Sequence, residues 1–193
     1  MNRITIFFSA LLLIGALAPA CDKNAPSPIV HTPAERDTLV VNAPDTATVF
    51  ILVRHAEKAA TGGNDPDLSA DGQLRAAELA RMLKEAPVAA VLASNYKRTR
   101  QTVETVAADH GLTVQLYDPN AQAALSKIWP QQFAGQTVLV VGHSNTVPQL
   151  VNLLTGTTNF AQLPDEQYDN LYIVTVYRHS PARVLHLKYG KAT

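Results

Sequence analysis

A chain of 193 residues with 16 lysine plus arginine and 16 aspartate plus glutamate side chains has no formal net charge at pH 7. That balance excludes a general electrostatic attraction to nucleic acid or to an anionic membrane surface. The length suffices for one domain with a stable core and an additional tail, and an apolar fraction of 47% is ordinary for a globular protein.

The first twenty residues have the three-part pattern of a secretory signal peptide. Arg3 supplies a positive charge, residues 4–18 are almost wholly apolar, and residues 18–20 are small. The apolar run is too short to be a good membrane-spanning helix. We therefore predict that residues 1–20 are a signal peptide outside the fold and that the protein is exported.

Cys21 follows this segment and is the only cysteine of the chain, so a disulfide within one chain is impossible. The stretch "LAPAC" resembles the lipobox of bacterial lipoproteins, in which the cysteine is acylated and becomes the new N-terminus. The resemblance implies a protein anchored by lipid to a bacterial membrane, facing the periplasm or the exterior. The alternative is an incidental cysteine beside a cleavage site.

Residues 21–46 are predicted to be a tether between this anchor and the domain. Four prolines are scattered through them, and the only periodic run is Leu39–Val41, which could add a short edge strand. A flexible chain of this length spans about 25–30 Å on average, enough to hold a domain clear of a membrane surface.

In residues 47–193 strand patterns alternate with helix patterns. We predict strands at 49–53, 88–93, 112–117, 137–141, 171–177 and 183–189, and helices at 71–85, 97–110, 121–133 and 145–154. The first helix has Ser69 or Asp71 as its N-cap, and Gly111 ends the second. The first helix is expected to bury one face, made of Leu79, Met82, Leu83 and Ala86.

This order predicts an α/β domain, a three-layer α/β/α sandwich with a mostly parallel central sheet and an antiparallel edge. In such sheets ligands bind beyond the carboxyl ends of the strands. Arginine and histidine side chains follow three of the predicted strands. Arg54 and His55 follow the strand at 49–53, Arg98 comes shortly after Ser94 and the strand at 88–93, and His143 follows the strand at 137–141. Arginine matches phosphate oxygens and histidine can act as a nucleophile near neutral pH, so this edge is predicted to be a phosphate site.

The stretches "RHAEK", "LSADGQLRA", "SNYKRTRQT" and "VVGHSNT" carry a specific resemblance. They are similar, in order, to the motifs of the histidine phosphatase superfamily, branch 1, which includes phosphoglycerate mutase and the small bacterial phosphohistidine phosphatases. The resemblance implies that His55 is a nucleophile that becomes phosphohistidine, and that Arg54, Arg98 and His143 hold the phosphoryl oxygens. It places Ser94 and Asn145 near the pocket and implies no metal or other cofactor.

The general acid that protonates the leaving group has two candidates. Asp118 follows the third predicted strand, and Glu57 lies two residues beyond the nucleophile. Pairing of Glu57 with Lys58 or with an arginine of the pocket would make it a poor acid. We therefore favour Asp118. The loops 59–67, 117–123 and 155–167 are expected to set specificity.

These observations favour a phosphatase that acts on phosphomonoesters or phosphoramidates, with a small phosphorylated molecule or a phosphohistidine protein as its partner. One alternative is a mutase that returns the phosphoryl group to its substrate. Mutases of the family carry a long insertion between the arginine helix and the second histidine, whereas 44 residues lie between Arg98 and His143 here. The other alternative is a phosphate-binding module without catalysis. The physiological substrate and the oligomeric state stay open.

Overall fold

The structure of the protein is a computed structural model that describes residues 46–193. The predicted signal peptide, Cys21, the tether and the possible strand Leu39–Val41 lie outside the described residues. The predicted domain boundary at residue 47 is not tested by it.

Six strands form one mixed sheet in the order β3-β2-β4-β1-β5-β6. The parallel strands are β1 (Ala47–Arg54), β2 (Val88–Ser94), β3 (Val114–Tyr117) and β4 (Thr137–Gly142). β5 (Asn170–Tyr177) pairs antiparallel with β1, and β6 (Arg183–Lys188) pairs antiparallel with β5. The predicted fold class is confirmed, because the sheet is parallel except for an antiparallel edge of two strands.

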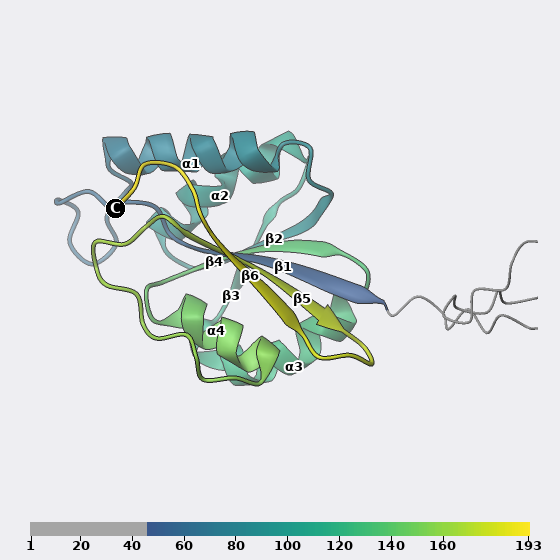
Figure 1. The fold of residues 1–193 in the computed structure, drawn as a ribbon. Helices are drawn as coiled ribbons and strands as arrows, with labels where there is room; N and C mark the ends of the chain where they lie inside the picture. Colours follow the sequence, from purple (N-terminus) through teal and green to yellow (C-terminus); the bar gives the residue numbers. More distant parts are fainter. Residues whose placement is uncertain (1–45) are drawn as a thin grey trace, which may run out of the picture. The chain divides into compact units, whose positions relative to one another are not determined.

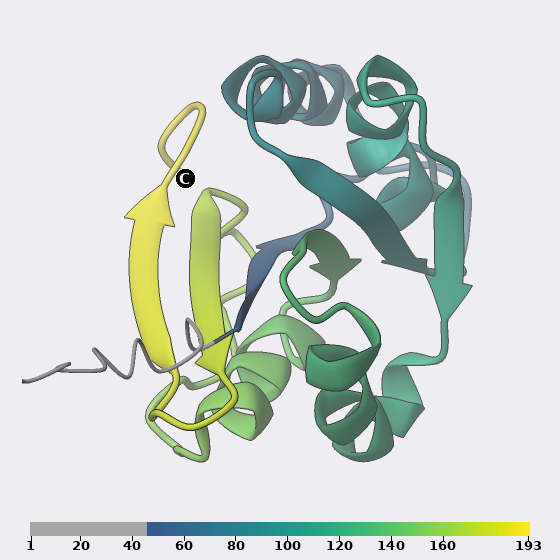
Figure 2. The same cartoon turned by 90° about the vertical axis from the view of Figure 1, so that its right-hand side faces the viewer.

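Two pairs of helices cover opposite faces of the sheet (Figure 1). α1 (Ala70–Leu83) and α2 (Lys97–Asp109) lie on one face, while α3 (Gln122–Gln132), preceded by a 3₁₀ turn at Pro119–Ala121, and α4 (Thr146–Thr155) lie on the other. Viewed along the sheet, the two antiparallel strands stand at one edge of this sandwich (Figure 2). None of the helices within residues 46–193 is long and apolar enough to cross a membrane.

β1 shows how the strand pattern builds two cores. Its residues alternate between faces, so Phe50 and Leu52 belong to the core beneath α3 and α4, and Ile51 and Val53 belong to the core beneath α1 and α2. Because both faces are covered, the strand reads as a continuous apolar run. The charged residues begin only where β1 leaves the sheet, which explains the abrupt change after Val53.

The helix ends follow the predicted chemistry. Ser69 is the N-cap of α1, and its hydroxyl oxygen accepts a hydrogen bond from the Gly72 N–H at 3.1 Å. Gly111, with φ of 65°, follows the end of α2 in the left-handed conformation that favours glycine.

The expected burial of Met82 is wrong, because this side chain is 39% exposed. α1 ends at Leu83 rather than near residue 85, and the face it buries is made of Gly72, Arg75, Ala76, Leu79, Ala80 and Leu83. That face contains a charged residue, Arg75, which an apolar pattern could not include. The stripe is therefore rotated away from Met82.

Candidate active site

The two histidines of the predicted site come together because β1 and β4 are neighbouring parallel strands. Arg54 is paired with Gly142 in the register, and the His55 N–H donates to the Gly142 carbonyl at 2.9 Å. His55 and His143 thus leave adjacent strands at equivalent positions. Their ring centroids are 5.4 Å apart at an interplanar angle of 66°.

His55 is 4% exposed, and its ring is oriented by the main chain. Its Nδ1 lies 2.8 Å from the Ala56 carbonyl oxygen. A carbonyl only accepts, so Nδ1 carries the proton and the lone pair is on Nε2. Burial, with the nearby charges of Arg54 and Arg98, lowers the pKa of His55 to about 3. The imidazole is therefore neutral at physiological pH, as an attacking nitrogen must be.

His143 is held by two hydroxyl groups. Its Nε2 lies 2.9 Å from Ser94 Oγ, and its main-chain N–H donates to Thr146 Oγ1 at 2.9 Å. Burial, followed by the charges of Arg98 and Arg54, lowers its pKa to about 4. Ser94 is fully buried at the end of β2, so it acts on the site through His143. Asn145 is exposed at the start of α4 and makes no capping bond with its side chain.

The guanidinium of Arg54 is fixed by the loop that precedes β5. Arg54 is 3% exposed, and its Nη1 donates to the carbonyls of Pro164, Asp165 and Gln167 at 2.9 to 3.0 Å. Its Cζ lies 4.1 Å from the ring centroid of Tyr168. The loop predicted to set specificity at 155–167 therefore reaches the site.

Arg98 enters from the first turn of α2 and is fixed less tightly. Its Nη1 lies 3.4 Å from the Asn64 carbonyl oxygen and 3.7 Å from Asp65 Oδ1, both in the predicted loop at 59–67. Its Cζ lies 4.3 Å from the ring centroid of Tyr96. Its backbone carbonyl accepts from Thr102 Oγ1, and that oxygen in turn accepts from the Ala56 N–H, which ties α2 to the segment after the nucleophile.

The Nε–H groups of both arginines are buried and find no acceptor within residues 46–193. A buried donor without a partner costs about 1–3 kcal/mol, more for a charged group. The oxygens of an anion would satisfy both donors. The two arginines also act on both histidines, because their charges lower the pKa values of His55 and His143 together.

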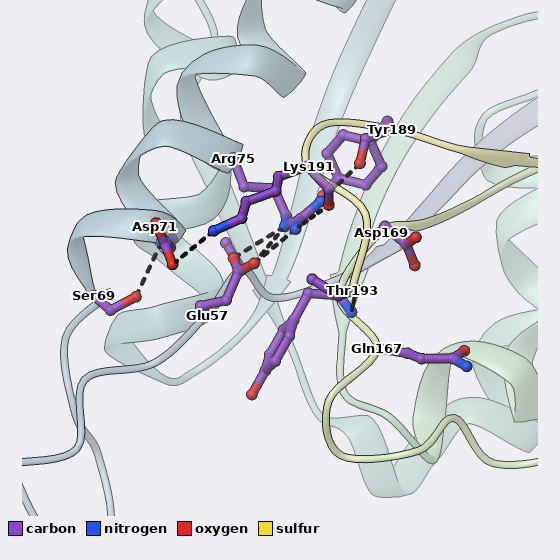
Figure 3. Close-up of polar contacts among 12 residues, drawn as sticks. Glu57, Ser69, Asp71, Arg75, Gln167, Asp169, Tyr189, Lys191 and Thr193 are labelled. Atoms are coloured by element: carbon purple, nitrogen blue, oxygen red, sulfur yellow. Dashed lines mark hydrogen bonds and ion pairs between the residues drawn. The ribbon is translucent and has the colours of Figure 1, made fainter.

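Glu57 is turned toward α1 and bound there by Arg75 (Figure 3). Arg75 Nε donates to both carboxylate oxygens at 3.0 Å, and its Nη2 donates to Oε1 at 2.7 Å. The remaining guanidinium donors bind the carbonyls of Tyr189 and Lys191, each at 2.7 Å. The partner is therefore neither Lys58 nor an arginine of the pocket. Both carboxylate oxygens of Glu57 are thus occupied by charge-assisted hydrogen bonds from Arg75.

Asp118 lies at the carboxyl end of β3, where it caps the 3₁₀ turn. It is exposed, and its Oδ1 accepts from the Asn120 N–H at 2.9 Å. Together with Asn95 and Tyr96 it lines a cleft of about 570 Å³. The Tyr96 ring in turn meets the His143 ring edge-on at 5.0 Å, so this cleft adjoins the histidines.

Sequence reasoning missed Tyr96, Tyr168 and Arg75. No periodic signal along the sequence separates a tyrosine over an arginine from one in the core. Arg75 did carry a signal, since it occupies the i+3 position from Gly72 on the buried face of α1. The carbonyls around Arg54 carry no side-chain signal at all.

This arrangement of two arginines beside a neutral histidine suits a tetrahedral oxyanion. Within residues 46–193 no group of three histidine, cysteine, aspartate or glutamate side chains is arranged to hold a metal ion. The family model of the histidine phosphatase superfamily (branch 1) matches residues 50–119, which include Arg54, His55 and Arg98. Over these residues the chain is similar to the histidine phosphatase superfamily.

Solved structures show the same fold at low sequence identity. The protein histidine phosphatase SixA complexed with tungstate is 19% identical with a TM-score of 0.60, over 72% of this chain and 96% of that one. A mycobacterial glucosyl-3-phosphoglycerate phosphatase is 15% identical with a TM-score of 0.59, over 75% of this chain and 100% of that one. A phosphoserine phosphatase mutant from Entamoeba histolytica, in complex with phosphoserine, is 17% identical with a TM-score of 0.56, over 74% and 96%. No curated protein matches the chain in sequence.

The depressed pKa values predict that acid weakens the fold before carboxylates titrate. An unfolded histidine binds a proton as the pH falls through 6.5, whereas folded His55 and His143 stay neutral down to about 3 and 4. Stability is therefore fully present above pH 6.5 and falls as pH drops below it, by about 1.4 kcal/mol per pH unit for each histidine. Urea unfolding between pH 6 and pH 5 measures this slope.

The matched variant is His143→Gln, which removes one of the two histidines that bind a proton when the chain unfolds. Its stability is expected to depend less steeply on pH, by about 1.4 kcal/mol per pH unit. An unchanged slope in the variant would contradict a neutral, buried His143.

Proposed function

We propose that this protein is a metal-independent phosphatase that hydrolyses phosphomonoesters or phosphoramidates through a phosphohistidine formed on His55. The observation that carries the proposal is a neutral imidazole with its lone pair on Nε2, beside two arginines whose buried Nε–H groups find no acceptor in the described part of the chain. The match of residues 50–119 to the superfamily model and the phosphatase structures of the same fold support the activity class.

In the first step His55 Nε2 attacks phosphorus in line with the leaving group. A nitrogen–phosphorus bond forms, the bond from phosphorus to the leaving oxygen or nitrogen breaks, and the leaving atom takes a proton from a nearby acid. Charge on the equatorial oxygens is stabilised by Arg54, Arg98 and His143. The Ala56 carbonyl stabilises the positive charge that the imidazole acquires, because it accepts the Nδ1 proton.

In the second step water attacks the phosphohistidine, and His55 leaves as a neutral imidazole. The acid that protonated the leaving group takes one proton from this water. Inorganic phosphate is released. We assign the acid to Asp118, because it is exposed in the cleft next to Tyr96 and its carboxylate meets no cation there, whereas Glu57 is bound by Arg75.

The mutase alternative is less favoured. The chain between Arg98 and His143 is occupied by β3, the 3₁₀ turn, α3 and β4, so it offers no extra segment to close over a bound intermediate. The non-catalytic alternative is less favoured because His55 keeps a nucleophilic tautomer. Structures of this fold include a protein histidine phosphatase and a phosphoserine phosphatase in complex with phosphoserine. We propose a small phosphorylated molecule or a phosphohistidine protein as substrate.

His55→Ala is expected to abolish turnover of p-nitrophenyl phosphate, because no other group forms the covalent intermediate. Arg98→Ala should lower kcat by about 10²–10³, as expected for the loss of one charge-stabilising donor. His186→Ala, which removes a histidine on the exposed strand β6, serves as the control and should keep full activity. EDTA should have no effect. Activity in His55→Ala, or its loss with EDTA, would remove the mechanism.

Asp118→Asn tests the acid through its dependence on the leaving group. p-Nitrophenolate departs without a proton, whereas an alkoxide needs one, so the variant should lose far more activity on an alkyl phosphate than on p-nitrophenyl phosphate. Asp165→Asn is the control for a carboxylate near the site, at 3.9 Å from Arg54 Nη2. If Glu57→Gln shows the selective loss instead, with its melting temperature retained, Glu57 is the acid.

We further propose that acylated Cys21 anchors the exported domain to a bacterial membrane, with residues 22–46 as spacer. The sequence pattern alone supports this location. Cys21→Ser should move the protein from the membrane fraction to the soluble fraction after export, because the acyl chains supply the membrane affinity. Export of wild-type protein in soluble form would contradict the anchor.

A further inference from the structure

The guanidinium carbon of each arginine of the site lies over a tyrosine ring. Arg54 lies over Tyr168 at 4.1 Å and Arg98 lies over Tyr96 at 4.3 Å. We infer that Tyr96 and Tyr168 are positioning residues, an aromatic clamp that holds both arginines edge-on to the phosphoryl group. This inference rests on the proposed function for its substrate, although oxyanion binding tests it independently.

The two tyrosines also flank the histidines. The Tyr168 ring lies 5.9 Å from the His55 ring, and the Tyr96 ring lies 5.0 Å from the His143 ring. Because the two histidine rings are themselves 5.4 Å apart, four rings form a continuous row from Tyr168 to Tyr96. Each end of the row thus carries one arginine, and each arginine is adjacent to one histidine.

Ordinary packing does not account for either ring. Neither tyrosine belongs to the hydrophobic clusters of the domain, and Tyr96 is 37% exposed. Tyr96 also occupies the N-cap position of α2, where serine, threonine, aspartate or asparagine would stabilise the helix, and it makes no capping bond with its side chain. A tyrosine at this position stabilises the helix less than a capping residue would. We therefore look for a role of its ring outside the helix.

The use follows from the shape of a guanidinium. Its N–H donors all lie in its plane, so an arginine stacked on a ring presents only its edge to a ligand. Stacking also removes water from one face and compensates with attraction to the ring. For Arg54 and Arg98 the Nε–H is buried and has no acceptor within residues 46–193, so each guanidinium plane keeps a charged donor that no described residue uses. The clamp therefore lowers the ordering needed when an oxyanion binds.

The test compares Leu and Phe at both positions, because Phe keeps the ring and removes only the hydroxyl. We expect Tyr168→Leu and Tyr96→Leu each to weaken binding of inorganic phosphate about tenfold by isothermal titration calorimetry, the size of a partly desolvated cation–π contact. kcat/KM for p-nitrophenyl phosphate should fall by at least as much. Tyr168→Phe and Tyr96→Phe should keep wild-type affinity.

Tyr177→Leu is the matched control, because Tyr177 also has an arginine over its ring, Arg183 at 5.8 Å, but pairs with Ala47 at the opposite end of β1. It should leave phosphate affinity unchanged. Folded Leu variants that bind phosphate like wild type, or Phe variants that lose as much as Leu, would overturn the clamp. Wild-type protein that binds phosphate with this pattern but turns over no phosphate ester would overturn the proposed function and leave the clamp in place.

Discussion

The in-register parallel pairing of β1 with β4 is the constraint on which the site depends. Arg54 pairs with Gly142, and the His55 N–H donates to the Gly142 carbonyl. This register brings the rings of His55 and His143 side by side at the carboxyl ends of the two strands. A shift by one residue would send these side chains to opposite faces. The two cores that cover β1 and β4 prevent such a shift, because it would turn apolar side chains toward the wrong helices. Packing far from the site therefore fixes its geometry.

Burial keeps the two histidines neutral and also leaves charged arginine donors without acceptors among the described residues. Two arginines and two histidines lie close together with few compensating acids, since the carboxylates of Asp65 and Asp165 are exposed and no nearer than 3.7 Å. The histidines stay neutral because burial and the arginine charges lower their pKa values. The arginines are held by main-chain carbonyls and by tyrosine rings. The oxyanion that we propose as ligand would relieve this arrangement, because it would accept from the charged donors.

The segment that follows His55 is stabilised by an ion pair outside the cluster of two arginines and two histidines. Arg75 binds Glu57 and the carbonyls of the segment that follows β6, so it connects β1, α1 and the last described residues (Figure 3). Gly72 allows this approach, since a Cβ there would lie 2.1 Å from the Glu57 carbonyl oxygen. Glu57 is thereby fixed against Arg75 of α1.

The sequence by itself determined the element order, the fold class and the four central side chains, because apolar periodicity and residues after strand ends are local signals. Even the N-cap Ser69 and the terminating Gly111 were readable, since capping depends on a few adjacent residues. Only the tertiary structure decided the partner of Glu57, the rotation of the buried face of α1 past Met82, and the positions of Tyr96 and Tyr168 over the arginines. These features depend on contacts between residues distant in the chain or on contacts with backbone carbonyls. Such contacts leave no pattern along the sequence.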